Sequence, residues 1–485
     1  MIIFDGFIWL WSHFGWLNII IVFAIIYLGR RKPARSTMMW IMVMALLPFV
    51  GFAFYLMMGL DRRRNKMFRK KGESDHAIQQ LIAYQQSELV AGKDPFLGSD
   101  FEQYRDLVCI NLNMDEGVFT DGNSCRLFFD GRDKFQALFE DLDHAKRTIE
   151  IQYYIVRSDG LGRQLMDHML AAAKRGVRVR FLIDAVGGRK LKDADANRMR
   201  DAGIEMAVFF PSFFKQINPR INYRNHRKLV TIDDHIGYIG GFNVGDEYLG
   251  ESEKFGYWRD THMRIEGPAV LDLKIRILQD WFYASGEDPV KEPSFRIPKE
   301  SSGSVAMQLV TSGPDTNFPN IKYAMIEMIH TAQKVIYIQS PYLIPDRTMM
   351  DALTLARLRD VEVNVMIPNK PDHPFTLSAN MSYAGELIQL GAHVYRYENG
   401  FLHAKTMVVD DAVSFIGSAN LDERSFSLNF EASEMVYSRE VNRTMCLQFQ
   451  RDVKESTLLT PEIFRRRPMI EKLKEPIARL FSPIL

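Results

Sequence analysis

Two short stretches of the 485-residue sequence place a histidine, a lysine and an aspartate at the same spacing. In each, six further residues separate the aspartate from a glycine-rich turn that ends in an asparagine. The members are His226, Lys228, Asp233 and Asn243 in the first stretch, and His403, Lys405, Asp410 and Asn420 in the second. One copy of such a pattern is weak, because these residue types are common at strand ends. Two copies with identical spacing favour an active site built by a repeat.

The residue types in this pattern suit chemistry at a phosphate. Residues two apart in a strand project from the same face, so each histidine lies beside its lysine. An imidazole can attack phosphorus or protonate a leaving oxygen, and an ammonium group neutralises a non-bridging oxygen. We expect Asn243 and Asn420 to donate amide hydrogen bonds to the same phosphate. The odd spacing turns Asp233 and Asp410 off this face, so we expect them to hold the motif together rather than react.

The same histidines do not predict a metal site. Zinc and iron sites need three or four ligands at tight spacing, whereas each histidine here has a lysine beside it that repels a cation. The three cysteines, Cys109, Cys125 and Cys446, show no metal-ligand spacing and do not predict a disulfide framework. We therefore expect neither a metal nor another cofactor.

The elements that carry the two motifs repeat in order along the chain. Apolar periodicity predicts a strand, a helix and a second strand before each motif, an order typical of parallel α/β units. The predicted segments are 149–156, 161–175 and 177–183 in the first half, and 335–344, 348–359 and 361–367 in the second. The fold class that follows is α/β, with two pseudo-symmetric repeats whose mostly parallel sheets are flanked by helices.

Composition shifts and proline-rich or serine-rich stretches suggest six segments. They are a membrane hairpin with basic flanks (1–71), a connecting segment (72–119), the first repeat (120–285), a linker (286–304), the second repeat (305–445) and a helical tail (446–485).

The N-terminal segment contains two apolar runs, Phe7–Leu28 and Met38–Leu60, joined by a short basic loop. Each is long enough to cross a bilayer, which takes about 20 residues. A cleaved signal peptide is the alternative for the first run, but no basic n-region or small-residue cleavage site accompanies it. The second run contains Pro48 and Gly51, so it either spans or re-enters the membrane. We favour two spans, which makes the protein multi-pass, with the catalytic part cytoplasmic.

Charge is distributed unevenly along the chain. The formal net charge is +1, which gives no argument for nucleic acid as a partner. Residues 1–71 carry eleven basic and two acidic side chains, a net charge of +9 beside the apolar runs. Basic residues at this position favour anionic lipid headgroups. We therefore expect an anionic lipid membrane as the partner.

The doubled HxKxxxxD pattern, each copy with its glycine-rich turn, resembles the signature of the phospholipase D superfamily. Three further stretches and the N-terminal hairpin are similar to bacterial cardiolipin synthases in particular. These stretches are Trp258–Asp260, Leu309–Asp315 and Gln339–Tyr342. The resemblance implies transfer of a phosphatidyl group from one phosphatidylglycerol to another through a phosphohistidine, with release of glycerol at the bacterial inner membrane.

The resemblance also implies roles for individual residues. It favours His226 as the nucleophile and His403 as the general acid and base, although sequence symmetry alone leaves the assignment even. It further places a carboxylate after each asparagine to orient a histidine. Glu431 fits this position in the second half, and Asp260 fits it less closely in the first, seventeen rather than eleven residues past the asparagine.

Other functions remain open at this point. Water as the acceptor would give a phospholipase D-type hydrolase or a nuclease, because acceptor choice depends on how dry the pocket is. Another alcohol acceptor, or a nucleotide-activated lipid donor, would give a different phosphatidyltransferase. A non-enzymatic membrane scaffold is the third alternative, and the presence of every motif histidine and lysine argues against it.

Two further stretches allow two interpretations each. Phe209–Phe214 either dips into the membrane interface or forms a buried strand end. The basic and then amphipathic stretch from Arg465 to Leu485 either lies on the membrane surface or packs as a terminal helix.

Overall fold

The computed structural model describes residues 99–115, 117–210, 223–287, 303–370, 372 and 375–480, with scattered positions between 20 and 87. Most of the predicted hairpin and most of the predicted linker lie outside these residues. Among the residues described, no helix is both long and apolar enough to cross a bilayer. The chain divides into two compact units, and the unit formed by residues 74–213 and 220–485 contains both motifs.

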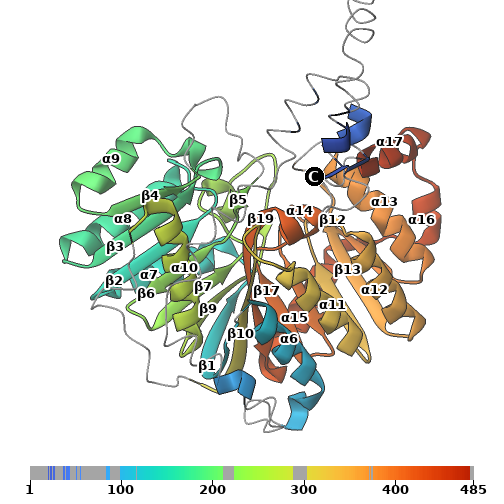
Figure 1. Ribbon diagram of the computed structural model, residues 1–485, viewed down its shortest axis with the longest axis horizontal. Helices are drawn as coiled ribbons and strands as arrows, with labels where there is room; N and C mark the ends of the chain where they lie inside the picture. Colours follow the sequence, from blue (N-terminus) through green and yellow to red (C-terminus); the bar gives the residue numbers. More distant parts are fainter. Residues whose placement is uncertain are drawn as a thin grey trace, which may run out of the picture. The chain divides into compact units, whose positions relative to one another are not determined.

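Two series of elements follow one another in this unit, as Figure 1 shows. The helices η3 (Ser99–Tyr104) and α6 (Arg105–Asp115) precede them. The first series is β1 (Phe119–Phe128), α7 (Gly131–His144), β2 (Thr148–Tyr153), α8 (Gly160–Lys174), β3 (Arg178–Asp184), η4 (Gly187–Lys190), α9 (Asp193–Asp201), β4 (Glu205–Phe209), β5 (Arg224–Asn225), β6 (Leu229–Ile232), β7 (Ile236–Gly240), η5 (Asp246–Leu249), β8 (Trp258–Arg259), β9 (His262–Glu266) and α10 (Ala269–Ser285).

The second series repeats this order and adds a C-terminal extension. It consists of β10 (Val305–Ser312), α11 (Asn320–Thr331), β11 (Val335–Gln339), β12 (Leu343–Ile344), α12 (Arg347–Leu358), β13 (Glu362–Pro368), α13 (Thr376–Gln389), β14 (His393–Tyr397), β15 (Phe401–Leu402), β16 (Thr406–Val409), β17 (Val413–Gly417), β18 (Leu421–Asp422), α14 (Glu423–Ser427), β19 (Asn429–Tyr437), α15 (Arg439–Lys454), β20 (Ser456–Leu458), α16 (Pro461–Arg465) and α17 (Met469–Leu480). The boundary expected at residues 445/446 therefore falls within α15.

Local signals explain where the predicted helices begin and end. The Asp159 side chain accepts a hydrogen bond from the Gly162 backbone at the start of α8, and Asp346 does the same for Met349 in α12. Gly176, with a positive φ of 86°, follows the end of α8. The strand–helix–strand units predicted from periodicity are thus confirmed in both repeats.

The two repeats share one sheet rather than forming two. In the described part of the chain its strand order is β20-β14-β13-β11-β16-β17-β19-β10-β1-β9-β7-β6-β2-β3-β4, with β5 attached to β19. The outer strands of each repeat, β2-β3-β4 and β11-β13-β14, are parallel as predicted. The central strands from β16 to β6 are antiparallel, so the prediction of mostly parallel sheets is wrong for the centre. Tight hairpins such as β6–β7 join these strands, and only antiparallel neighbours can be connected so directly.

Apolar side chains fill the space between the sheet and its helices. Separate clusters lie beneath α7 and α8 in the first repeat and beneath α11, α12 and α13 in the second. A third cluster joins the repeats under α10 and α15. Phe209 and Phe210, at the end of β4, are buried against Phe430 and Tyr283. This supports the buried-strand interpretation for those two residues, and the rest of Phe209–Phe214 lies outside the described residues.

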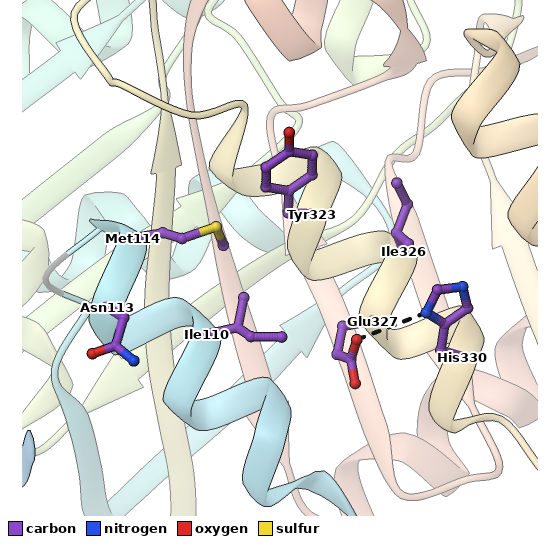
Figure 2. A pocket seen from close by; sticks show the side chains of 7 residues that line it. All are labelled: Ile110, Asn113, Met114, Tyr323, Ile326, Glu327 and His330. Carbon is purple, nitrogen blue, oxygen red and sulfur yellow. Dashed lines mark ion pairs between the residues drawn. The ribbon is translucent and has the colours of Figure 1, made fainter.

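A pocket opens between α6 and α11 (Figure 2). Its lining is Ile110, Asn113, Met114, Tyr323, Ile326, Glu327 and His330. None of the motif residues contributes to it, so it is separate from the candidate site.

Candidate active site

The strand pairing crosses between the repeats where each motif begins. β5 runs parallel to the start of β19, and the His226 backbone N–H donates to the Phe430 carbonyl at 2.9 Å. β15 runs parallel to β8, and the His403 N–H donates to the Arg259 carbonyl at 2.7 Å. Each histidine is therefore held next to a strand of the other repeat.

This crossing determines which carboxylate contacts which histidine. The Nδ1 atom of His226 lies 2.9 and 3.0 Å from the two carboxylate oxygens of Glu431, which belongs to the second repeat. The Nδ1 atom of His403 lies 2.6 Å from Oδ2 of Asp260, which belongs to the first. When Nδ1–H donates to the carboxylate, the lone pair of Nε2 stays available to attack or to take a proton. The family resemblance pointed to both carboxylates but not to this exchange of partners.

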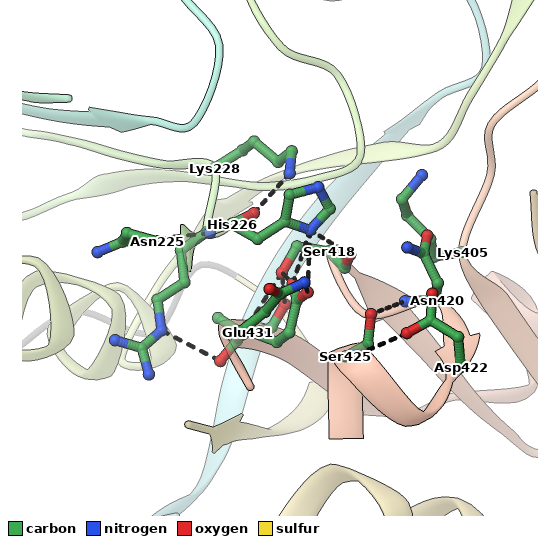
Figure 3. A network of polar contacts seen from close by, with 12 residues as sticks. Asn225, His226, Lys228, Lys405, Ser418, Asn420, Asp422, Ser425 and Glu431 are labelled. Carbon is green, nitrogen blue, oxygen red and sulfur yellow. Dashed lines mark hydrogen bonds and ion pairs between the residues drawn. The ribbon is translucent and has the colours of Figure 1, made fainter. Parts of the chain in front are cut away.

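Polar groups from the second repeat surround Glu431, as Figure 3 shows. The Ser418 hydroxyl donates to Oε2 at 2.5 Å, and the Asn429 amide donates to Oε1 at 3.1 Å. Burial would raise the pKa of Glu431, but His226, Lys228 and Ser418 together hold it below its usual value. Glu431 is thus an ionised carboxylate fixed in one orientation.

The first repeat has glycine in place of the serine, and the structure shows why. A Cβ atom at Gly241 would lie 2.0 Å from Oδ1 of Asp260, a distance that no side chain tolerates without displacing the carboxylate. Asp260 instead accepts a hydrogen bond from the Thr261 backbone at 2.8 Å. Gly241 therefore makes the space that Asp260 needs to reach His403.

Both lysines turn back over their own motifs. Lys228 Nζ donates to the His226 carbonyl at 2.5 Å, and Lys405 Nζ donates to the His403 carbonyl. Each ammonium group lowers the pKa of both histidines, which indicates that all four groups share one electrostatic site.

The pKa values in this site are shifted chiefly by burial. Burial lowers the pKa of His403 to about 4, with Lys405 adding to the shift and Asp260 opposing it. Burial also lowers the pKa of His226, against the opposing effect of Glu431. The pKa values of Lys228 and Lys405 fall to about 7 and about 8 for the same reason. A phosphate anion would favour the charged form of all four groups, so the site is suited to an anionic ligand.

Two buried arginine–aspartate pairs support the segments that carry the histidines. Arg227 contacts both oxygens of Asp280 at 2.7 and 2.6 Å, and donates to the Glu431 carbonyl at 3.1 Å. Arg259 contacts Asp452 at 2.8 Å, and donates to the Asp260 carbonyl at 2.5 Å. Each guanidinium group thereby touches the residue that orients a histidine.

These pairs are equivalent in space but not in sequence. Gln152 and Gln339, on equivalent strands, donate to Asp280 and Asp452, each at 2.8 Å. Arg227, however, lies inside the first histidine motif, where the second repeat has Ala404. Arg259 precedes Asp260, where the second repeat has Phe430 before Glu431. Sequence spacing reveals neither pair, and the glutamine repeated on β2 and β11 is a signal that points to them.

The motif aspartates lie away from the histidines, at the opposite ends of β6 and β16. Asp233 accepts hydrogen bonds from the backbone of residues 146, 147 and 148, at 2.7 to 3.0 Å. Asp410 accepts them from residues 333, 334 and 335, at 2.6 to 2.8 Å. Both have positive φ angles, 53° and 51°, in the turn that follows their strand. Both aspartates therefore hold the backbone around the motif in place, as expected, and neither contacts the motif histidines or lysines.

The two asparagines are placed differently from one another. Asn243 accepts from the Ile155 backbone and donates to the Tyr248 hydroxyl, both at 3.1 Å, so part of its amide is already engaged. Asn420 is buried, and its Oδ1 atom has no hydrogen-bond partner among the described residues. Figure 3 shows Asn420 with Lys405 and Asp422 on the second-repeat side of the site.

Aromatic rings border both imidazoles. The Tyr154 ring meets the His226 ring edge-on at 5.0 Å, and Trp258 lies 5.1 Å from His403. Within the described part of the chain, no group of three His, Cys, Asp or Glu side chains is arranged to hold a metal ion. The site can therefore offer two imidazoles and two ammonium groups to a phosphate.

The chain is similar to known families along most of its length. A family model described as "Cardiolipin synthase, PLD-like domain" matches residues 138–255 and 325–453, and one described as "Phospholipase_D-nuclease N-terminal" matches residues 16–59. A cardiolipin synthase of Oceanobacillus iheyensis is 45% identical, with 97% of each chain covered. The major cardiolipin synthase ClsA of Bacillus subtilis is 43% identical, with 98% of each chain covered.

A solved structure supports the fold. The phosphatidylserine synthase of Haemophilus influenzae superimposes with a TM-score of 0.57, at 14% identity, and covers 79% of this chain and 100% of its own. At that identity the likeness concerns the architecture alone.

Proposed function

Because this chain belongs to the cardiolipin synthase family of phospholipase D-like proteins, we propose that it makes cardiolipin from two molecules of phosphatidylglycerol and releases glycerol. The observation that carries this proposal is the exchanged pairing of two histidines with two buried carboxylates beside two lysines. One phosphate can meet both imidazoles in such a site.

In the first step, Nε2 of His226 attacks the phosphorus of the donor lipid while the bond from phosphorus to the glycerol oxygen breaks. His403 gives its proton to that oxygen, and glycerol leaves. Glu431 holds the His226 ring so that its Nε2 lone pair faces the phosphate. Lys228 and Lys405 neutralise the non-bridging oxygens as charge develops on them.

In the second step, Nε2 of His403 removes the proton from a free hydroxyl group of a second phosphatidylglycerol. The resulting oxygen attacks phosphorus, the phosphorus–nitrogen bond breaks, and His226 is released as a neutral imidazole. Asp260 assists these proton transfers, because it favours the charged form of His403. The proton that leaves with glycerol in the first step is replaced in the second by the one taken from the second phosphatidylglycerol, so the two steps together return both histidines to their starting state.

The membrane arrangement completes the proposal. The two apolar runs of residues 1–71 would anchor the chain in the bacterial inner membrane as a multi-pass protein, and their basic flanks would face anionic lipid. The catalytic unit would then lie on the cytoplasmic side, at the surface that supplies its substrate.

Product analysis tests the proposal. Purified protein and phosphatidylglycerol, with a chelator and without nucleotide, should yield cardiolipin and free glycerol in equal amounts. The His226→Ala variant is the control and should yield neither. Phosphatidic acid as the main product would show that the enzyme is a hydrolase. An absolute need for a cytidine nucleotide would show that the donor is an activated lipid.

A further inference from the structure

The C-terminal helix α17 packs against the protein with its polar face. Arg479 forms an ion pair with Glu386 of α13 and lies over the Tyr383 ring at 4.6 Å. Glu475 forms an ion pair with Arg467, and Ala478 is fully buried. Helices of globular proteins usually pack with the apolar stripe inward, so this arrangement is inverted.

The opposite face of α17 is apolar and exposed. Its residues are Met469, Ile470, Leu473, Ile477 and Leu480, which are between 53% and 80% exposed. At 3.6 residues per turn these five positions fall within an arc of about 100°. Lys472 and Lys474 fall on either side of that arc, and the Arg465–Arg467 run directly precedes the helix. An apolar stripe with flanking cations is typical of helices that lie in a membrane interface.

The position of α17 connects it to the active site. α17 packs along α13, and Asn380 of α13 contacts the backbone of Pro341 and Leu343 at 2.9 and 2.8 Å. These residues directly follow β11, the strand that carries Gln339. Figure 1 shows α17 at the same end of the sheet as α14 and β12. The Ser425 hydroxyl of α14 accepts a hydrogen bond from the backbone of Asn420 in the site, at 3.1 Å. A bilayer in contact with α17 would therefore lie at the end of the sheet from which a lipid substrate would reach the site.

We propose that α17 is an interfacial helix whose exposed apolar face inserts into an anionic bilayer and holds the rim of the active site against the lipid. The choice of lipid as the occupant rests on the proposed function and on the excess of basic over acidic side chains from residue 461 to 480, six against three. A second copy of the chain would not need the flanking cations, whereas anionic headgroups attract them.

Fluorophores attached at single positions test the insertion directly. The full chain, with its native cysteines replaced, is labelled at Leu473 or Ile477 on the apolar face, or at Glu471 or Lys474 elsewhere on the helix. It is then reconstituted into vesicles of equal parts phosphatidylglycerol and phosphatidylethanolamine. Labels at 473 and 477 should be quenched by nitroxides on the upper acyl chain, and labels at 471 and 474 by a water-soluble quencher.

Other occupants would give different results, and each would overturn the proposal. Energy transfer between labels of two copies without quenching by lipid would indicate a dimer. Protection from both quenchers, with or without lipid, would indicate that another segment of the chain covers the face. Equal access of all four labels to the aqueous quencher would show that nothing covers it.

Kinetics supply an independent readout. The Leu473→Ser/Ile477→Ser double variant should raise KM for phosphatidylglycerol in vesicles by about tenfold while leaving kcat unchanged, because two apolar side chains no longer enter the interface. The matched control, Leu355→Ser/Leu358→Ser on α12, removes two leucines that are 52% and 72% exposed and should change neither value.

The two proposals can fail separately. If the labels on α17 enter the bilayer but the protein makes no cardiolipin, the proposed function fails and the interfacial role of α17 stands. If it makes cardiolipin while the labels stay in water, only the assignment of α17 fails.

Discussion

At the scale of single residues, each histidine depends on a carboxylate that the other repeat supplies. Glu431 and Asp260 are both fully buried, and their pKa values lie below the usual range because the imidazoles and lysines around them outweigh burial. Neither repeat alone contains a histidine with its orienting carboxylate. The unit of function is therefore the pair of repeats.

Replacing Asp260 should separate the roles of the two histidines. Asp260 raises the pKa of His403, so Asp260→Asn lowers it further and leaves less of the charged form. The limb of the kcat/KM profile that falls with rising pH should then move to lower pH. Activity at neutral pH should drop on the order of 10²-fold, as expected for impaired general acid catalysis.

The matched variant Glu431→Gln should shift the limb of the kcat/KM profile that rises with pH. Glu431 raises the pKa of His226, so its loss lowers that pKa and makes the neutral nucleophile available at lower pH. The rising limb should therefore move to lower pH. Profiles measured with phosphatidylglycerol in mixed micelles check both variants, and a shift of the same limb in both would contradict separate roles.

The buried arginines allow an exchange experiment. Arg259→Phe should destabilise the protein by about 3–5 kcal/mol, because it leaves the Asp452 carboxylate buried without its cation. Adding Ala404→Arg should restore much of that loss, since the double variant copies the arrangement at the other half-site, where Arg227 and Phe430 occupy the equivalent positions. Thermal unfolding of both variants measures the effect. A double variant no more stable than Arg259→Phe would show that the two half-sites are not equivalent.

The sequence identifies the motif residues because their spacing is local, but it does not show which carboxylate contacts which histidine. The two identical spacings were enough to find His226 and Lys228, although both residues lie between β5 and β6 rather than within a strand as expected. Nothing in spacing shows that Glu431, 205 residues away along the chain, contacts His226 rather than His403. That choice depends on the pairing of β5 with β19, a contact between strands far apart in sequence.

At the scale of secondary structure, the apolar periods predicted the helix and the second strand of each strand–helix–strand unit to within one residue. The first strands, β2 and β11, begin where expected but end three and five residues before the predicted ends. The fused sheet was not predicted, because the pairing of β1 with β10 joins strands separated by the whole first repeat. Local patterns carry no information about which strand edges meet. The position of α15 across an expected boundary has the same cause, since its packing on the central sheet decides where the repeat ends.

The central strand β19 carries a buried acid that provides a further prediction. Both carboxylate oxygens of Glu434 are buried without a hydrogen-bond partner among the described residues. Burial, with a contribution from Asp272, raises the pKa of Glu434 well above its usual value. The folded state therefore binds this proton more tightly than the unfolded state, and stability falls as pH rises from the unfolded pKa towards the folded one.

Glu434→Gln should remove this pH dependence, because an amide of the same shape has no proton to lose. The variant should be more stable than the unaltered chain at neutral pH, and the difference should grow by up to about 1.4 kcal/mol per pH unit through that window. Denaturant unfolding at several pH values between 5 and 8 provides the measurement. The exposed Glu440→Gln variant is the control, and a constant difference across the pH range would contradict an ionising Glu434.

At the scale of the whole molecule, one continuous sheet brings two copies of a motif to a single site. β10 pairs with both β1 and β19, so the repeats join through backbone hydrogen bonds as well as through the apolar cluster beneath α10 and α15. In the mechanism that we propose, this union lets one histidine from each repeat act on a common phosphate. Two-step transfer needs such a site, since one histidine holds the phosphatidyl group while the other moves protons.

Trapping the covalent intermediate tests this account most directly. A phosphatidyl ester with a leaving group that needs little protonation, such as p-nitrophenol, is mixed with the His403→Ala variant, quenched and analysed by mass spectrometry of peptides. A peptide that carries the phosphatidyl group on His226 should form faster than it is hydrolysed, and no adduct should form in the His226→Ala variant. Release of p-nitrophenol over many turnovers with no adduct on either histidine would contradict it.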